Sequence, residues 1–214
     1  MKLRLKPNGE KGKLIVFEGT DGAGKTSLIE ITKRYLQARL GEDQVVQVKQ
    51  PTDLSRKTRL FQKMMFCPQH AEIDYRAVQL LTLSDRLQHQ HEVILPALRA
   101  GKVVISDRYV FTSVANMECR GFSENWFYRV ARNIIRPDLC ILAAVTPQLA
   151  LERIRKRLEE RDRYFDESLL IRVAEYFKKH AREWDMIVLD TSFPVEKTFE
   201  KILPFIEGLF GEAL

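Results

Sequence analysis

Residues 14–27, LIVFEGTDGAGKTS, constrain the fold more than any other part of this chain. A short apolar run, typical of a buried parallel strand, leads into a glycine-rich turn and then into a helical pattern. The spacing Gly19-xxxx-Gly24-Lys25-Thr26 is the phosphate-binding P-loop pattern, in which backbone N–H groups and the positive end of a helix gather around phosphates. An ordinary glycine-rich turn is the competing interpretation. The strand before the loop and the helix after it favour binding of ATP or GTP.

Each part of this loop has an expected role in holding a nucleotide. Lys25 would reach the β- and γ-phosphates, and the hydroxyl group of Thr26 would ligate Mg²⁺. The sequence therefore predicts ATP and Mg²⁺ as cofactors. The residues predicted to bind them are Gly19, Asp21, Gly22, Ala23, Gly24, Lys25, Thr26 and Ser27.

The length of 214 residues predicts a single α/β domain over residues 1–214, and a composition of 45% hydrophobic and 30% charged residues is typical of a globular protein. No apolar run is long enough for a membrane span, and the basic N-terminal segment lacks the apolar centre of a secretory signal. Three scattered cysteines favour reduced thiols, with Cys140 in an apolar strand pattern as a core residue. We expect a cytoplasmic protein with no membrane partner.

The net charge of +6 suits an anionic partner. Much of the basic density lies in residues 153–163, where acidic residues are interleaved, whereas a nucleic-acid-binding stripe usually lacks such acids. Phosphates of small nucleotides explain the charge as well as nucleic acid does. We therefore expect small nucleotides, and no nucleic acid, as partners.

Apolar strand patterns alternate with helical periods along the chain. The predicted strands are residues 13–18, 45–49, 102–106, 138–145 and 186–190. The predicted helices are residues 25–40, 54–65, 72–99, 108–119, 124–134, 147–159, 166–183 and 195–209. This alternation requires a parallel sheet with helices on both faces, whose ligand site lies at the carboxyl ends of the strands. We therefore expect the chemistry at residues 18–26, 49–53, 106–109 and 190–191.

The segment VVISDRY, in which Arg108 follows Asp107, separates the classes of nucleotide-binding protein. The guanine-reading Asn-Lys-x-Asp or Thr-Lys-x-Asp of a GTPase is absent, and a motor-type ATPase would have a glutamate after the aspartate to orient water. An arginine cannot activate water but can hold a second phosphate, which favours phosphoryl transfer to a phosphorylated acceptor over hydrolysis. The competing interpretation is that Asp107 and Arg108 form only an ion pair at the end of a strand.

Three segments, in order, resemble the thymidylate kinase family of P-loop nucleoside monophosphate kinases: FEGTDGAGK, SDRY at 106–109, and RPDLCILAAVTPQLALERIRKR at 136–157. The resemblance covers about residues 13–190. It implies a three-layer α/β/α fold with a five-stranded parallel sheet, a short mobile lid over about residues 157–165, and transfer of the γ-phosphate of ATP to dTMP. It also implies a homodimer joined through helices, for which residues 73–98 and 108–119 are suitable.

The resemblance agrees with the physical chemistry of such a transfer. A phosphomonoester has a second pKa near 6, so the acceptor already carries a nucleophilic oxygen at pH 7 and needs no general base. Catalysis is then the alignment of two phosphates and the neutralisation of their charge. We assign Asp107 to Mg²⁺ through water, and Arg108 and Lys49 to the acceptor phosphate. The predicted catalytic residues are Lys25, Asp107, Arg108 and, from the lid, Arg157, Arg161 and Arg163, each of which could instead pair with a neighbouring acid.

The resemblance also implies contacts with the rest of the acceptor. Arg86 matches the arginine that contacts the acceptor nucleotide, although a solvated helix arginine is the alternative. Asp21 matches the carboxylate that binds the 3′-hydroxyl group, and Tyr164 matches the lid-side tyrosine that favours deoxyribose. The predicted acceptor-binding residues are Asp21, Lys49, Pro51, Thr82, Arg86, Arg108, Tyr109, Ser113, Asn116 and Tyr164.

The chain departs from the family pattern at several positions. Lys49 stands where an arginine is common, Thr82 where a phenylalanine stacks on thymine, and Asn116 where an aromatic residue is common. Gly22 stands where some relatives have an arginine, so the lid would have to supply that charge. The sequence therefore predicts dTMP as the acceptor and leaves open dUMP, CMP or dCMP, or a nucleoside. A nucleotide-binding regulator without catalytic activity is the alternative from another class.

Overall fold

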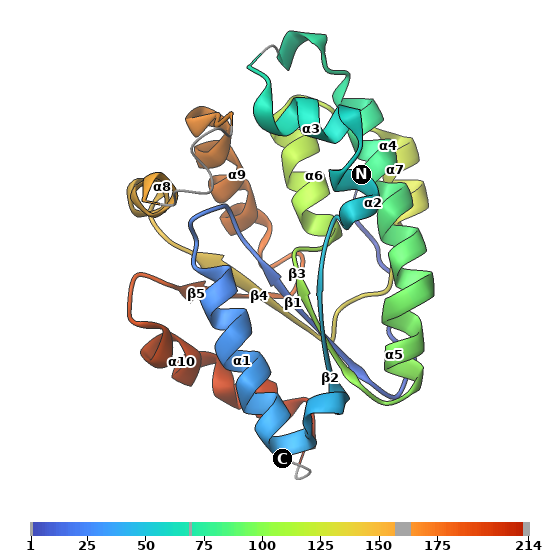
Figure 1. Cartoon of the computed structure of the whole chain (residues 1–214), viewed down its shortest axis with the longest axis vertical. Coiled ribbons are helices and arrows are strands. Elements are labelled where there is room, and N and C mark those ends of the chain that lie inside the picture. The colour runs from blue at the N-terminus through green and yellow to red at the C-terminus, as the bar shows by residue number, and fades with distance from the viewer. Residues whose placement is uncertain (1, 69, 157–163, 212–214) are drawn as a thin grey trace.

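A computed structural model describes residues 2–68, 70–156 and 164–211 (Figure 1). Its centre is a sheet of five parallel strands in the spatial order β2-β3-β1-β4-β5. The strands are β1 (Lys13–Glu18), β2 (Val45–Lys49), β3 (Val103–Asp107), β4 (Leu139–Ala144) and β5 (Met186–Asp190). The predicted fold class, a three-layer α/β/α fold with a five-stranded parallel sheet, is confirmed.

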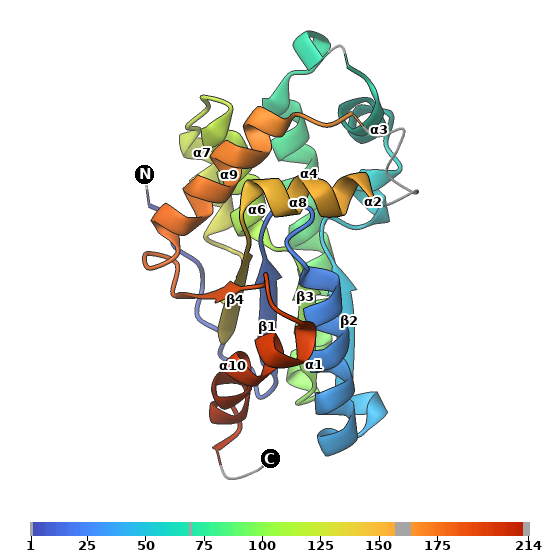
Figure 2. The same cartoon turned by 90° about the vertical axis from the view of Figure 1, so that its left-hand side faces the viewer.

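Helices cover both faces of the sheet (Figures 1 and 2). One face carries α1 (Lys25–Leu40), α8 (Pro147–Arg155) and α10 (Val195–Gly208). The other face carries α4 (Tyr75–His89), α5 (Leu95–Arg99), α6 (Val110–Cys119), α7 (Asn125–Ala131) and α9 (Glu167–His180). Shorter elements are α2 (Asp53–Arg56), α3 (Arg59–Phe66), the 3-10 turns η1 (Glu42–Gln44) and η2 (His70–Glu72), and a π-helical turn η3 (Gln90–Ile94).

The apolar run of β1 supplies two cores because successive side chains of a strand point to opposite faces of the sheet. Leu14 and Val16 pack into the core shared with α4, α6, α7 and α9. Ile15 and Phe17 pack into the core shared with α1, α8 and α10. The strand that leads into the P-loop is thus fixed from both sides, and so is the loop that follows it.

Several predicted boundaries differ from those in the structure. The predicted helix over 54–65 is divided into α2 and α3, because the side chain of Thr58 accepts a hydrogen bond from the backbone N–H of Phe61 and starts a new helix. The predicted helix over 108–119 begins later, at Val110, because Arg108 has a φ of 67°, outside the helical region. The predicted helix over 72–99 is interrupted by η3, and β3 ends at Asp107 rather than at 106.

Cys140 is buried in the core, as expected. None of the described helices combines the length and the apolar character needed to span a bilayer.

Candidate active site

Neighbouring strands end together at one edge of the sheet. In the parallel register, Phe17 of β1 and Lys49 of β2 both lie beside Asp107 of β3. The residues that follow these strand ends are the P-loop, the segment beginning at Gln50, and Arg108. The topology therefore brings three separate parts of the sequence to the position where parallel sheets bind ligands.

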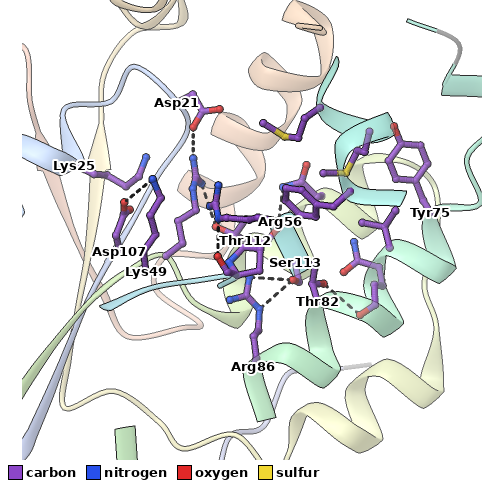
Figure 3. Close-up of a pocket in the computed structure, with 18 of the residues that line it drawn as sticks. Asp21, Lys25, Lys49, Arg56, Tyr75, Thr82, Arg86, Asp107, Thr112 and Ser113 are labelled. Carbon is purple, nitrogen blue, oxygen red and sulfur yellow. Dashed lines mark hydrogen bonds and ion pairs between the residues drawn. The ribbon is translucent and has the colours of Figure 1, made fainter. Parts of the chain in front are cut away.

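A cavity of about 390 Å³ opens at this edge (Figure 3). Its size is within the range of small-molecule sites. Most of the predicted site residues line it: Asp21, Gly22, Gly24, Lys25, Thr26, Lys49, Pro51, Thr82, Arg86, Asp107, Arg108, Ser113 and Asn116. Of the remaining P-loop residues, Gly19 and Ala23 are buried, and Ser27 is exposed in the first turn of α1.

Close packing explains why the P-loop is rich in glycine. Gly24 has a φ of 80° and stands directly before the first residue of α1. A Cβ atom at Gly22 would collide with the backbone carbonyl oxygen of Ala150, because α8 packs directly on the loop (Figure 2). A side chain at position 22 could therefore not be accommodated without moving α8.

The ammonium group of Lys25 lies inside the loop. Its Nζ donates hydrogen bonds to the backbone carbonyl oxygens of Gly19, at 3.0 Å, and of Thr20, at 2.7 Å. Burial, followed by the positive charge of Arg108, lowers the pKa of Lys25 to about 8. A phosphate group in the loop would favour the charged form of Lys25 and would replace the carbonyl oxygens as its partner.

Arg108 reaches back from the end of β3 to the P-loop. Its Nη1 donates to the carbonyl oxygen of Gly19 at 3.0 Å and to Oγ1 of Thr112 at 3.3 Å, and its Nη2 pairs with the carboxylate of Asp21. Burial disfavours the cation, but Asp21 and then Asp107 outweigh it, so the pKa of Arg108 is raised. The alternative in which Asp107 and Arg108 form only a strand-end ion pair is therefore wrong for this site.

Asp107 faces the loop with an unsatisfied oxygen. Its Oδ2 lies 3.9 Å from Nζ of Lys49, while its Oδ1 is buried with no hydrogen-bond partner among the described residues. A buried carboxylate oxygen without a partner is costly and suits a water molecule or a hydrated cation. Thr26 lines the same cavity, so the two residues fit Mg²⁺ that is also held by phosphate oxygens. No group of three or more acidic, histidine or cysteine side chains in the described part of the chain could hold a metal ion.

Glu18 is a buried residue that the sequence analysis did not single out. Its carboxylate accepts hydrogen bonds from the backbone N–H groups of Tyr109, at 2.9 Å, and Thr112, at 3.0 Å, and from the Thr112 hydroxyl at 2.5 Å. Burial raises the pKa of Glu18, and the hydrogen bond from Thr112 and the charge of Arg108 oppose that rise. Glu18 thus fixes the start of α6 relative to the P-loop. An acidic residue that ends an apolar strand was the available signal.

Arg86 is 1% exposed, so its interpretation as a solvated helix arginine is wrong. Its Nη1 donates to Oε1 of Gln50 at 2.8 Å, and its Nη2 and Nε donate to Oγ of Ser113 at 3.3 and 3.4 Å. Burial lowers the pKa of Arg86 to about 10. Its guanidinium is therefore a fixed cation in the wall of the cavity.

The residue before Arg86 holds the segment that follows β2. The carboxylate of Asp85 accepts hydrogen bonds from the backbone N–H of Thr52 at 2.8 Å, from the Thr52 hydroxyl at 2.9 Å, and from the backbone N–H of Ser55 at 3.1 Å. One turn of α4 thus fixes the cavity wall around Pro51. Sequence reasoning missed this role, since nothing local to Asp85 indicates it.

The end of the cavity away from the P-loop is lined by side chains of α3 and α4 (Figure 3). The Thr82 hydroxyl donates to the backbone carbonyl oxygen of Gln79 at 3.3 Å, so it turns back onto its own helix. The aromatic surface that Thr82 cannot offer comes instead from Phe61, Phe66 and Tyr75. These aromatic residues lie outside the positions where the family pattern places them.

Two polar side chains that were not predicted, Arg120 and Gln79, lie with the predicted Asn116 in the lining of the same cavity. The Arg120 guanidinium lies 3.9 Å from the centroid of the Tyr75 ring. Nε of Arg120 and Oε1 of Gln79 are buried without a hydrogen-bond partner in the described part of the chain. Asn116 donates from its Nδ2 to the carbonyl oxygen of Thr112 at 2.9 Å, which leaves its amide oxygen available to a ligand.

Two predicted acceptor-binding residues do not line the cavity. Tyr109 is buried in the core, where its hydroxyl donates to the carbonyl oxygen of Ile135 at 2.9 Å, because its backbone N–H is held by the end of β1. The ring of Tyr164 packs 4.1 Å from that of His70, and its backbone N–H donates to the carbonyl oxygen of Met65 at 2.9 Å. The predicted lid residues Arg157, Arg161 and Arg163 lie outside the described residues.

Two arginines that the sequence analysis did not assign also reach the site. Arg56 lines the cavity, and its Nε donates to the carbonyl oxygen of Pro51 at 2.7 Å. Arg153 of α8 donates from Nη2 to the carbonyl oxygen of Thr191 at 2.9 Å and from Nη1 to that of Gly22 at 3.4 Å. Arg56 thus lies beside the predicted segment 49–53, close to it in sequence, whereas Arg153 is brought to the P-loop from a distant part of the sequence.

Comparisons with known proteins agree with this geometry. The family described as thymidylate kinase matches residues 17–202. A probable thymidylate kinase of Thermococcus kodakarensis is 34% identical over 206 residues, covering 92% of this chain and 98% of the relative. The thymidylate kinase of Limosilactobacillus reuteri is 30% identical over 212 residues, covering 94% of this chain and 98% of the relative.

A solved structure supports the fold. The crystal structure of thymidylate kinase from Ehrlichia chaffeensis aligns with a TM-score of 0.71, covers 91% of this chain and 98% of that one, and is 20% identical in sequence. The region that matches the family contains the P-loop, Asp107 and Arg108, and these residues line one cavity. The chain belongs to the thymidylate kinase family, whose reaction is the ATP-dependent phosphorylation of dTMP to dTDP.

Proposed function

We propose that the P-loop holds the phosphates of ATP while Arg108, Lys49 and Arg56 hold the phosphate of dTMP, so that the two nucleotides meet at the carboxyl edge of the sheet. The observation that carries this proposal is the position of Arg108. Its guanidinium contacts both the P-loop, through Gly19, and the wall of the acceptor cavity, through Thr112. A cation in that position lowers the repulsion between two phosphates brought close together.

The transfer itself needs alignment and charge neutralisation from these residues. The phosphate oxygen of dTMP attacks the γ-phosphorus of ATP in line, and the bond to the β-phosphate oxygen breaks, so no protein base takes part. Lys25 neutralises the β- and γ-phosphates, and Arg157, Arg161 and Arg163 are proposed to add charge at the γ-phosphate. Mg²⁺ would be held by Thr26 directly and by Asp107 through water, and would neutralise phosphate charge.

The buried arginine of α4 supports a base that presents a carbonyl oxygen to it. An arginine only donates hydrogen bonds, so Arg86 suits an oxygen of thymine or uracil better than the amino group of cytosine. Oε1 of Gln79, which has no hydrogen-bond partner among the described residues, suits an N–H donor such as that of the thymine imide. We propose that Phe61 and Tyr75 provide the stacking surface that position 82 lacks. Asp21 is proposed to accept the 3′-hydroxyl hydrogen bond.

The test is ADP release from ATP and Mg²⁺ with a panel of acceptors: dTMP, dUMP, UMP, dCMP, CMP, AMP, GMP and thymidine. We expect dTMP to give the highest kcat/KM, with dUMP ahead of dCMP. A preference for dCMP would contradict the proposed role of Arg86. Turnover of thymidine but not dTMP, or full activity of Arg108→Ala, would refute the acceptor-phosphate assignment. Absence of turnover with every acceptor would favour the alternative function, a nucleotide-binding regulator without catalytic activity.

The sequence also predicts a cytoplasmic location and a homodimer, and both stay proposals. Leu80 and Val93, on the helical segment suggested for the dimer, are exposed, at 55% and 36%, which supports an interface there. Light scattering coupled to size-exclusion chromatography would measure the oligomeric state.

A further inference from the structure

A glutamine connects the buried arginine of α4 to a histidine one turn further along the same helix. Gln50 is fully buried and follows the last residue of β2. Its Oε1 accepts a hydrogen bond from Nη1 of Arg86 at 2.8 Å, and its Nε2 lies 3.1 Å from Nδ1 of His89. Ser113 accepts the other hydrogen bonds of the guanidinium. The direction of Arg86 thus depends on two neighbours, one of which is Gln50.

The hydrogen-bonding capacities of the three side chains allow one arrangement. Arginine only donates, so the carbonyl oxygen of Gln50 must face Arg86. The NH₂ group of the same amide must then face His89. Nδ1 of His89 must accept, which fixes the imidazole as the neutral tautomer with its proton on Nε2.

The surroundings of His89 favour the neutral form. Burial lowers the pKa of His89, and the charge of Arg86 acts in the same direction, whereas Asp85 and Glu92 oppose both. Asp85 is already engaged by three hydrogen bonds from residues 52 and 55. The charged residues that line the same open groove on the side of β2 and α2 are Lys49, Asp53 and Arg56.

We propose that His89 is a positioning residue for phosphoryl transfer to dTMP, because through Gln50 it holds the guanidinium of Arg86 in the direction that binds the acceptor. This inference rests on the role of Arg86 given above. A protonated His89 has no acceptor at Nδ1, so the amide of Gln50 would turn over and present N–H groups to the donors of Arg86. The arginine would lose that partner, and the acceptor site would lose a fixed donor.

Three variants test the proposed link from His89 through Gln50 to Arg86. His89→Ala removes the acceptor, His89→Asn keeps an amide oxygen near the position of Nδ1 but cannot titrate, and His91→Ala is the matched control at an exposed histidine two residues away. We expect His89→Ala to raise KM for dTMP about five- to tenfold, as for one lost neutral hydrogen bond, with kcat and KM for ATP within about twofold of the parent. In His89→Asn the KM for dTMP should stay close to that of the parent, and His91→Ala should leave this KM unchanged.

The pH profile separates positioning from a merely structural role. The phosphate of dTMP itself titrates near pH 6, so the comparison must be between the parent enzyme and His89→Asn rather than of the parent alone. His89 becomes protonated as the pH falls below its lowered pKa, so we expect kcat/KM for dTMP to fall more steeply towards acid pH in the parent than in His89→Asn. Identical profiles would overturn the proposal.

A measurement without turnover completes the test. The ¹⁵N shifts of the His89 imidazole in the unliganded enzyme report which nitrogen carries the proton, and we expect Nε2. A proton on Nδ1, or a KM for dTMP unchanged in His89→Ala, would overturn the proposal. An enzyme that leaves dTMP unphosphorylated while His89 has the expected tautomer would instead refute the proposed function and leave the Gln50 contact intact.

Discussion

Replacing Glu18 by alanine removes the acceptor that holds the start of α6. Two backbone N–H groups, those of Tyr109 and Thr112, would then be buried without a partner. An unsatisfied buried donor costs about 1–3 kcal/mol, so the pair costs about 2–6 kcal/mol. The Thr112 hydroxyl can rotate to another acceptor and adds little. We expect Glu18→Ala to lower the free energy of unfolding by about 4 kcal/mol, a large part of the stability of a typical domain.

Glu18→Gln is the matched control, because its amide oxygen can accept both backbone N–H groups and it carries no charge to bury. We expect it to lose less than about half as much as the alanine variant, since burial already disfavours the carboxylate charge. Urea unfolding followed by tryptophan fluorescence measures both losses. A loss below about 1 kcal/mol for Glu18→Ala would refute the reasoning. Equal losses for the two variants would assign the effect to the charge rather than to the acceptor oxygens.

Two further predictions concern the nucleotide sites. Lys25, whose pKa of about 8 is lowered by burial, loses its proton as the pH rises through that value, so the Kd for ATP should rise by up to about tenfold per pH unit above it. Calorimetric titration measures this change, and a flat profile, or the same slope in Lys25→Ala, would contradict it. Asp21→Ala should raise KM for dTMP about tenfold and spare a 3′-deoxy analogue, because the analogue lacks the hydroxyl group that Asp21 is proposed to bind. Steady-state kinetics with both acceptors decides this, and equal losses would argue against the ribose role.

The fold could be predicted because its signals are local. The apolar run before Gly19, the spacing to Lys25 and the alternation of strand and helix patterns each depend on residues near one another in the sequence. Such patterns specify a parallel sheet and place the site at its carboxyl edge. The convergence of the P-loop with Asp107 and Arg108 follows from that topology alone.

The details that escaped prediction depend on packing between distant segments. Nothing near Tyr109 indicates that its ring turns into the core, since the cause is the hydrogen bond that its backbone N–H donates to the carboxylate of Glu18. The absence of an aromatic residue at Thr82 left other acceptors open, yet Phe61 of another helix lines the same cavity. The burial of Arg86 likewise depends on Gln50, which only the folded sheet edge brings within reach.

The contacts of Glu18 with α6 also affect when the site can form during synthesis. Glu18 and Thr112 are 94 residues apart, and Arg108 and Asp21 are 87 apart, so both contacts close very long loops. A nascent chain that has emerged only as far as α5 contains the complete P-loop but neither Arg108 nor the helix that completes the acceptor cavity. Such a chain also lacks β3 and β4, the two strands that flank β1 in the sheet, so the P-loop is not held in place until both have emerged, and the nucleotide site and the acceptor cavity form together.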